Sequence, residues 1–267
     1  MTDTRDRLLP TEVLFEGAFP RLSRRLRFGI VGGGRIAVIQ AMGARLSDRW
    51  EMVAGALSSD PVTAKARGAD WFLPDERCFA TYEEMATIEA ERPDGIDAVV
   101  ITTPNDGHYG AARAFLEAGI DVLCDKPLTN DLSEAIELLH LARKTGLVFC
   151  VAHAFTSFPM VRQAREMVQG GVIGQVNQIH TEYMQDWMTT DATAAAPHVK
   201  WRLDPAKTGL TSCTGDIGTH AHHMASFVSG LELTHLRAEL HVCGLPKTLD
   251  DTVMMMTRYA DDIPGTL

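Results

Sequence analysis

One lysine and an aspartate–histidine pair are the residues of this chain whose types and spacing best suit proton transfer. Lys126 follows an apolar run and precedes Pro127, which predicts a turn after a buried strand. A lysine that is partly desolvated near a positively charged group loses pKa and can exchange protons near neutral pH. The alternative for Lys126 is a solvated lysine in an ordinary strand-to-helix turn.

The pair is Asp216 and His220, four residues apart in the segment 215–223, so a helix would bring both to one face. A carboxylate beside an imidazole orients the ring and raises its pKa, as a general acid or base requires. Two alternatives stay open. The aspartate and the three histidines of this segment would hold zinc, although His222 points elsewhere on a helix and no H-E-x-x-H motif is present. Otherwise the histidines are incidental residues of a structural helix.

A glycine-rich turn near the start of the chain predicts a nucleotide site beside these groups. Phe28 to Val31 form an apolar strand pattern, and Gly32, Gly34 and Ala37 follow with the G-x-G-x-x-G/A spacing. Glycine permits the tight turn and the close approach of a pyrophosphate, and alanine lets the next helix pack on its strand. The phosphates would lie on free N–H groups at the start of that helix. A purely structural glycine turn is the alternative.

Strands and helices alternate from residue 28 to 152, which predicts a doubly wound parallel sheet of the Rossmann type. The expected strands are 28–31, 51–57, 97–103, 121–124 and 147–152, and the first helix is expected to be amphipathic through Ile36, Ile39, Met42 and Leu46. Ligands bind at the carboxyl ends of parallel strands. The residues we expect to bind the cofactor there are Gly32, Gly34, Arg35, Ile36, Ala37, Ser58, Ser59, Thr103, Pro104, Asn105, His108, Asp125 and Lys126.

The end of the second strand bears on the choice of cofactor. An acidic residue there normally binds the ribose hydroxyls of NAD and repels the 2′-phosphate of NADP. Ser58 stands at this place, and Asp60, followed by proline, has the pattern of a helix N-cap. The cofactor is therefore expected to be NAD or NADP, and Lys65 and Arg67 would either help to bind a phosphate or be solvated.

Beyond residue 154 the pattern changes to longer strands with few crossover helices, which predicts a second domain of α+β type with a mainly antiparallel open sheet. The expected elements are helices at 161–168 and 214–228, strands at 176–187, 236–242 and 252–259, and a loop at 191–209. Trp201 and Arg202 in that loop would close over the cofactor or anchor the loop. The chain thus divides into an arm (1–26), a Rossmann domain (27–153) and an α+β domain (154–267).

Composition narrows the class of protein. The formal net charge is −10 and no basic stripe is present, so we expect no nucleic-acid partner. No apolar run approaches the length of a membrane span. The five cysteines are odd in number and form no C-x-x-C motif, which favours reduced, mostly buried thiols in a cytoplasmic protein.

Four motifs together resemble the glucose–fructose oxidoreductase, inositol dehydrogenase and MocA family. They are Gly-Gly-Gly-Arg-Ile-Ala at 32–37, Thr103-Pro104-Asn105 with His108, Asp125-Lys126-Pro127, and Asp216-x-x-x-His220. The resemblance covers about residues 27–267. It implies a Rossmann domain followed by a domain whose open sheet supports the substrate site and subunit contacts. Family members carry Glu-Lys-Pro where this chain has Asp-Lys-Pro, a change that keeps the carboxylate.

The resemblance implies NAD(P)-dependent oxidation or reduction of a sugar, inositol or related polyol, with Lys126, Asp216 and His220 as catalytic residues. A substrate hydroxyl would lose its proton to His220, assisted by Lys126, while Asp216 holds His220. His153, Tyr183 and Trp187 are expected to line the polyol pocket with these three residues, and no metal is expected. The alternatives are a non-catalytic NAD(P)-binding protein and an NAD-dependent glycosidase.

Family members are longer than this chain, so we expect a C-terminally truncated second domain that lacks several strands of its sheet. The catalytic residues are present, but the expected oligomer surface depends on a complete sheet, and an exposed apolar sheet edge favours aggregation. A homo-oligomer is expected only if the sheet is complete.

Overall fold

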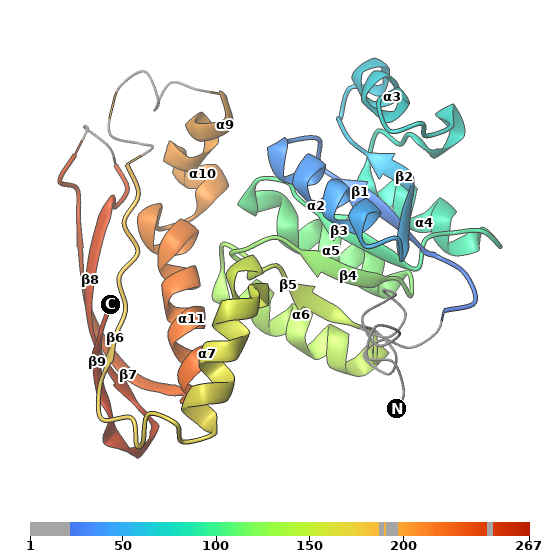
Figure 1. Cartoon of the computed structure of the whole chain (residues 1–267). Coiled ribbons are helices and arrows are strands. Elements are labelled where there is room, and N and C mark those ends of the chain that lie inside the picture. Colours follow the sequence, from blue (N-terminus) through green and yellow to red (C-terminus); the bar gives the residue numbers. More distant parts are fainter. Residues whose placement is uncertain (1–21, 187–189, 191–196, 245–247) are drawn as a thin grey trace, which may run out of the picture.

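The computed structural model describes residues 22–186, 190, 197–244 and 248–267. Two sheets stand side by side, each with helices packed against it, and α7 and α11 lie between them (Figure 1). Trp187 and most of the N-terminal arm lie outside the described residues.

The first sheet is a five-stranded parallel sheet with the strand order β2-β1-β3-β4-β5. This order reverses beside β1, as in the expected doubly wound fold. The strands are β1 (Leu26–Val31), β2 (Trp50–Ala56), β3 (Ala98–Ile101), β4 (Asp121–Cys124) and β5 (Phe149–Val151). The helices are α2 (Arg35–Leu46), α3 (Pro61–Ala69), α4 (Tyr82–Glu91), α5 (His108–Glu117) and α6 (Leu132–Thr145).

Local side chains set several helix boundaries. The carboxylate of Asp60 accepts the N–H of Thr63 at 2.8 Å and caps α3, as expected from the sequence. Asp131 caps α6 through the N–H of Ser133 at 2.7 Å. Gly146 ends α6 with a φ of 70°, a left-handed conformation that glycine adopts without a steric penalty.

The core of this domain lies on both faces of the sheet. One face buries a cluster that includes Phe115, Leu116 and Leu138, and the other a cluster around Phe28 and Ile30.

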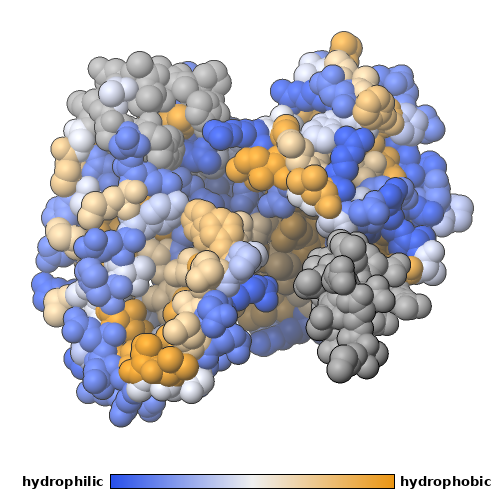
Figure 2. Space-filling model, viewed as in Figure 1, coloured by the Kyte–Doolittle hydropathy of each residue, from blue (hydrophilic) through white to orange (hydrophobic). Residues whose placement is uncertain are grey.

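The prediction that large apolar residues form the buried face of α2 is wrong. Small Ala37 and Ala41 are its buried residues, because they let the helix approach the sheet closely. Its larger apolar residues face outward, with Ile39, Met42 and Leu46 52%, 53% and 84% exposed. Hydrophobic side chains gather on the visible surface in the region of α2 (Figure 2).

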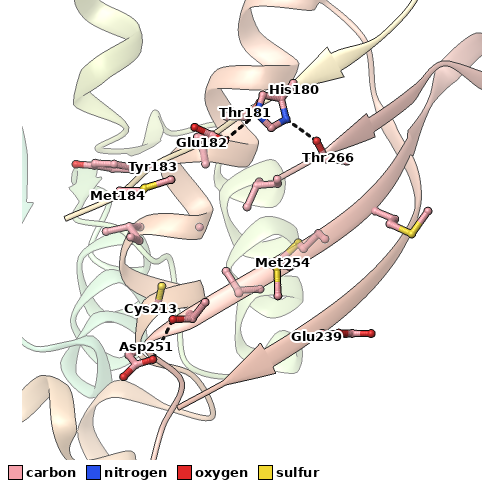
Figure 3. Close-up of a pocket in the computed structure, with 18 of the residues that line it drawn as sticks. His180, Thr181, Glu182, Tyr183, Met184, Cys213, Glu239, Asp251, Met254 and Thr266 are labelled. Atoms are coloured by element: carbon pink, nitrogen blue, oxygen red, sulfur yellow. Dashed lines mark hydrogen bonds and ion pairs between the residues drawn. The ribbon is translucent and has the colours of Figure 1, made fainter. Parts of the chain in front are cut away.

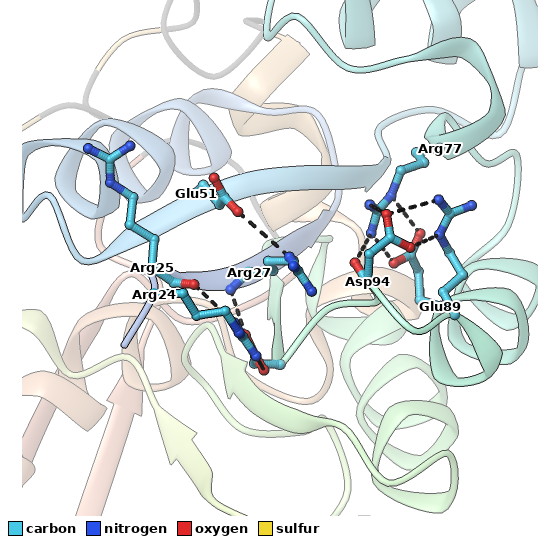
Figure 4. A network of polar contacts seen from close by, with 9 residues as sticks. Arg24, Arg25, Arg27, Glu51, Arg77, Glu89 and Asp94 are labelled. Atoms are coloured by element: carbon cyan, nitrogen blue, oxygen red, sulfur yellow. Dashed lines mark hydrogen bonds and ion pairs between the residues drawn. The ribbon is translucent and has the colours of Figure 1, made fainter. Parts of the chain in front are cut away.

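A polar network ties the start of β1 to the sheet (Figure 4). Both guanidinium Nη atoms of Arg24 donate to the Asp97 carboxylate at 2.7 Å, and the Arg27 N–H donates to the same carboxylate. A second, buried pair joins Arg77 to Glu89 on α4. Arg24, near the end of the arm (1–26), is therefore bound to the Rossmann domain.

The second sheet has the strand order β6-β9-β8-β7. Its strands are β6 (Ile179–His180), β7 (Leu233–His241), β8 (Thr252–Tyr259) and β9 (Pro264–Thr266). β8 is antiparallel to both β7 and β9, whereas β6 and β9 are parallel. Its helices are α7 (Pro159–Gln169), α9 (Pro197–Lys200), α10 (Pro205–Thr208) and α11 (Thr219–Ser229). A small core of Ala225, Tyr259 and Ile263 joins α11 to the sheet.

The structure corrects three expectations for the second domain. The strand expected at 176–187 is limited to Ile179–His180, because its neighbour β9 pairs only as far as Thr266 and Leu267. The expected loop at 191–209 contains α9 and α10 in its described part. The helix expected at 214–228 begins as a π-helical turn, Thr214–Gly218, before α11. The five cysteines are free as expected, but Cys150 and Cys243 are exposed.

Candidate active site

An ion pair between Lys126 and Asp216 forms the centre of the site. Lys126 leaves the carboxyl end of β4, and Asp216 lies on the π-helical turn before α11. The Lys126 ammonium donates to the Asp216 carboxylate Oδ1 at 2.5 Å and to the Asp216 carbonyl at 2.7 Å. Arg202 Nε lies 3.6 Å from the other carboxylate oxygen. The side chains of Lys126 and Asp216 are only 13% and 20% exposed.

The charged side chains near Asp216 determine the protonation state of its carboxyl group. Burial alone would raise the pKa of the Asp216 carboxyl, but the positive charges of Lys126 and Arg202 lower it below its usual range. Asp216 is therefore a carboxylate at neutral pH. Asp125 differs, because burial raises the pKa of its carboxyl although its Oδ1 accepts the N–H of Lys126 at 2.9 Å.

Aromatic rings form one wall of the site beside the ion pair. His220 on α11 lies 4.6 Å from the ring of Phe155, 5.6 Å from that of His153 and 6.3 Å from that of Tyr183, measured between ring centroids. His153, just after β5, stacks on His223 with centroids 4.1 Å apart. Segments from both sheets therefore contribute to this wall.

The expected rise in the pKa of His220 beside Asp216 is wrong. The Asp216 carboxylate is occupied by Lys126 and Arg202, because the π-helical turn that carries it does not keep the i, i+4 alignment of an α-helix. Burial, followed by the charge of Lys126, lowers the pKa of His220 to about 4, which outweighs the opposite effect of Asp216. His220 is thus a neutral imidazole at neutral pH, able to accept a proton.

His153 has the same protonation state for a similar reason. Burial and the neighbouring imidazoles of His223 and His220 lower its pKa to about 4. Its Nδ1 and that of His223 are buried without a hydrogen-bond partner in the structure. Buried polar atoms are seldom left without a partner, so these two nitrogens are unusual for a folded protein.

The glycine turn has the shape of a cofactor cradle. Gly32 has a φ of +106°, and a Cβ there would lie 2.8 Å from Thr102 Oγ1. A Cβ at Gly34 would meet nothing within 4 Å, so the backbone there is open to a ligand. Gly34 precedes α2 without a side-chain cap, which leaves the first N–H groups of this twelve-residue helix, at Arg35 and Ile36, available to an anion. These residues fit a dinucleotide pyrophosphate.

The end of β2 lies against this turn. A Cβ at Gly33 would clash with the Leu57 carbonyl oxygen and with Arg67 Nη1, and Arg67 donates to that carbonyl at 2.6 Å. Arg67 is therefore held at the glycine turn, whereas Lys65 is paired with Asp75 at 3.1 Å. Ser58 follows Leu57, and its hydroxyl accepts the N–H of Asp60 at 3.2 Å.

Other expected cofactor residues connect the loops of the site. Asn105 is 5% exposed and donates to the Thr208 carbonyl of α10 at 3.3 Å. The ring nitrogens of His108, 1% exposed, lie 2.8 Å from the Pro127 carbonyl and 3.0 Å from the Thr103 carbonyl. Arg202 stacks over the ring of Trp201 at 4.3 Å while it reaches Asp216.

Sequence reasoning missed Phe155, His223 and the position of Arg67. An apolar residue after a strand carries no signal of a ring contact, and only the fold brings Phe155 to His220.

Within the described ranges, no three side chains of histidine, cysteine, aspartate or glutamate are arranged to hold a metal ion. No described helix combines the length and the apolar character needed to cross a membrane.

Fold and site define a dinucleotide-binding Rossmann domain joined to an α+β domain, with a lysine, a carboxylate and a histidine where they meet. Residues 26–153 match the model of the oxidoreductase family with an NAD-binding Rossmann fold, and residues 161–267 match the GFO/IDH/MocA C-terminal domain. The chain belongs to the Gfo/Idh/MocA oxidoreductase family.

Individual relatives agree with this assignment. An uncharacterised oxidoreductase of Bacillus subtilis is 32% identical, over 92% of this chain and 64% of its own. The crystal structure of an oxidoreductase from Sinorhizobium meliloti is 42% identical with a TM-score of 0.81, over 92% of this chain and 65% of its own. An inositol dehydrogenase homologue from Azotobacter vinelandii, complexed with NAD⁺, is 29% identical with a TM-score of 0.87, over 92% and 64%. The chain thus spans about two thirds of the length of these relatives.

Proposed function

We propose that this chain is an NAD(P)-dependent dehydrogenase that acts on a CH–OH group of a sugar, inositol or related polyol. The observation that carries the proposal is the Lys126–Asp216 ion pair beside the neutral His220, at the strand ends that also carry the glycine cradle. The A. vinelandii relative, also solved with NADH and myo-inositol, supports the polyol class.

The residues of the candidate site have separate proposed roles in cofactor binding, proton transfer and charge stabilisation. Gly32, Gly34 and the first N–H groups of α2 would bind the pyrophosphate. The bound nicotinamide would accept or donate a hydride at its C4 carbon. The neutral imidazole of His220 accepts the proton of the substrate hydroxyl, and the ammonium of Lys126 stabilises the negative charge that develops on that oxygen.

Asp216 acts through Lys126 in this proposal. Its carboxylate and carbonyl hold the ammonium in one place, so the positive charge is oriented before substrate binds. His153, Tyr183 and Trp187 are proposed to line the polyol pocket, where the unpartnered Nδ1 of His153 would bind a substrate hydroxyl.

Both NAD and NADP remain within the proposal. The family model describes an NAD-binding fold, which supports NAD. Ser58 in place of an acidic residue, with Arg67 held at the glycine turn, supports acceptance of the 2′-phosphate of NADP as well. Trp201 and Arg202 are proposed to contact the cofactor from the second domain.

A turnover assay tests the proposal. The purified chain is incubated with NAD⁺ or NADP⁺ and a panel of myo-inositol and simple sugars, and the reverse direction is run with the reduced cofactors and the matching ketones. We expect cofactor reduction with at least one polyol. Cofactor binding without turnover in either direction would favour a non-catalytic binding protein, and release of sugar from a glycoside without net reduction would favour a glycosidase.

A further inference from the structure

Asp250, a buried residue shortly before β8, binds the segment that leads into the π-helical turn of the site. It is 6% exposed. Its carboxylate accepts the N–H of Ser212 at 2.6 Å and the N–H of Thr214 at 2.8 Å, and its carbonyl accepts the N–H of Cys213 at 3.2 Å. The hydroxyl of Thr214 donates to the same carboxylate at 2.8 Å. A single residue thus binds three successive backbone N–H groups.

These N–H groups lie at the start of a helix. The π-helical turn Thr214–Gly218 continues into α11, and the side chain of Cys213, at the N-cap position, does not cap it. The first N–H groups of a helix have no partner within it, and a side-chain oxygen close in sequence usually binds one of them. Here Asp250 supplies the oxygens from 36 and 38 residues farther along the chain. Figure 3 shows the start of β8, at Asp251, beside Cys213. The second sheet therefore holds the start of this helix.

Two hydrogen bonds connect Asp250 to Asp216 through Ser212. Ser212 donates its N–H to the Asp250 carboxylate, and its carbonyl accepts the N–H of Asp216 at 2.8 Å. Ser212 is 2% exposed, so both bonds lie in the protein interior, where hydrogen bonds are electrostatically stronger than in water. The Lys126 ammonium is bound by the carbonyl of Asp216 as well as by its carboxylate. The backbone of Asp216, and not only its side chain, therefore determines where this ammonium lies.

The chain that precedes this segment lies at the surface. α10 ends at Thr208, and Leu210 is 91% exposed. Burial returns at Ser212, where the contact with Asp250 begins. Without the Asp250 carboxylate, the N–H groups of Ser212 and Thr214 would lose their acceptor, and a buried donor without an acceptor is unfavourable. The start of the helix would then move to find other partners, and the Asp216 backbone would move with it.

We propose that Asp250 is a positioning residue of the dehydrogenase reaction, which holds the Asp216 backbone where Asp216 orients the Lys126 ammonium. This inference rests on the proposed function of the site. Asp250 acts through Ser212 and Asp216 and not on the substrate itself. Its loss therefore affects the step in which the ammonium stabilises the substrate oxygen, while the glycine cradle in the first domain still binds the cofactor.

Amide hydrogen exchange tests the link between Asp250 and Asp216 independently of turnover. Asp250→Asn keeps the size of the side chain, but only one of its two polar atoms can accept, so one N–H group loses its acceptor. We expect the Asp216 amide to exchange about tenfold faster or more than in the parent chain. The control is Asp97→Asn. The Asp97 carboxylate also accepts a backbone N–H, at 2.7 Å, but it lies before β3, at the end of the first sheet opposite the site. Asp97→Asn should leave exchange at Asp216 unchanged.

Turnover measures whether this link serves the reaction. We expect Asp250→Asn to lower kcat about 10–10²-fold, because a small displacement of a catalytic group has an effect of this size, and to leave the affinity for NADH unchanged. Asp97→Asn should turn over at the parent rate. In the Lys126→Ala variant, the further change Asp250→Asn should cause no additional loss of kcat, because no ammonium remains for Asp250 to position.

Three outcomes would overturn the proposal. Unchanged exchange at Asp216 in Asp250→Asn would mean that Asp250 does not hold this backbone. Faster exchange with the parent kcat would make Asp250 a structural residue only, and so would the same fractional loss of kcat in the parent chain and in Lys126→Ala. If Asp250→Asn does not fold, Thr214→Val, which removes the hydroxyl bound to the same carboxylate, is measured in its place with a smaller effect in the same direction.

Failure of the proposed function gives a different result. A parent chain without turnover, in which Asp250→Asn still speeds exchange at Asp216, would contradict the dehydrogenase reaction and with it the role of Asp250 in that reaction, but not the link between the two residues.

Discussion

Lys126 and Asp216 join the two domains through one ammonium group, which is 2.5 Å from the Asp216 carboxylate and 2.7 Å from the Asp216 carbonyl. Lys126 follows a strand of the first sheet, and Asp216 precedes the long helix packed on the second. The same pair thus connects the domains and supplies the charge proposed to act on the substrate oxygen.

Loss of the Asp216 charge should affect both the connection between the domains and the proposed stabilisation of the substrate oxygen. In Asp216→Asn the partly buried ammonium of Lys126 loses its counter-charge, and we expect a loss of about 1–3 kcal/mol in the free energy of unfolding together with a fall in turnover. The control is Glu117→Gln, which breaks the exposed Arg113–Glu117 pair, 2.9 Å apart, and should cost clearly less stability than Asp216→Asn. Urea unfolding measures both variants. Equal losses would show that the Lys126–Asp216 pair is an ordinary surface contact.

The glycine cradle can be tested by one methyl group. Gly34 has φ −85° and ψ −174°, values that alanine adopts, and a Cβ there meets no protein atom. We therefore expect Gly34→Ala to fold normally but to bind NADH about tenfold or more weakly, because the methyl group would fill the space proposed for the pyrophosphate. Gly43→Ala, also in open space but farther along α2, is the control. Unchanged NADH affinity in Gly34→Ala, measured by tryptophan fluorescence, would place the cofactor elsewhere.

Ser58 is the position proposed to determine cofactor preference. A carboxylate there would repel the 2′-phosphate of NADP, so Ser58→Asp should shift relative affinity toward NAD by about 1–2 kcal/mol, roughly tenfold. Ser47→Asp adds the same charge at the far end of α2 and should leave the ratio unchanged. Titrations with NADH and NADPH give the two affinities. A ratio that is the same in Ser58→Asp and the parent chain would show that Ser58 does not lie at the ribose.

The buried histidines make stability depend on pH. The pKa values of His153 and His220 are about 4 in the folded chain and near 6.5 in the unfolded chain, so the unfolded state binds more protons between these values. The free energy of unfolding should therefore fall as the pH is lowered from 6.5 to 4, by on the order of 1–2 kcal/mol for each of these half-buried groups.

A variant isolates this effect from the titration of carboxylates. His153→Gln removes one of the two histidines and should flatten the dependence between pH 6.5 and 4, whereas His140→Gln, at an exposed position of α6, should not. Urea unfolding at several pH values measures the slopes. Identical slopes in His153→Gln and His140→Gln would contradict the lowered pKa of His153.

Much of the first domain could be predicted because its signals are local. The strand 121–124 and the cap Asp60 depend on neighbouring residues, and the structure has them where expected. The buried face of α2 was predicted wrongly, because hydrophobicity alone favours the large residues, whereas close packing on a parallel sheet selects Ala37 and Ala41.

The remaining differences arise from contacts distant in sequence. Residues 181–186 have the alternation of a strand, but β9 pairs with Ile179 and His180 and then accepts one further bond, from the Thr181 N–H. Similarly, the spacing of Asp216 and His220 predicted a pair, while Lys126, ninety residues earlier, binds Asp216 instead. Lys126, Asp216 and His220 of the candidate site could be named from motifs, but the partners of their side chains could not.

The most direct test of the proposed dehydrogenase is isotope transfer. The chain is incubated with NAD⁺ or NADP⁺ and myo-inositol, or an active sugar from the panel, that carries deuterium on its CH–OH carbons, and the nicotinamide is examined by mass spectrometry. We predict deuterium in the reduced cofactor, formed about 10²–10⁴-fold more slowly by Lys126→Ala and at the parent rate by Lys144→Ala, an exposed lysine of α6. Reduced cofactor without deuterium, or equal rates in Lys126→Ala and Lys144→Ala, would contradict the proposed hydride transfer at this site.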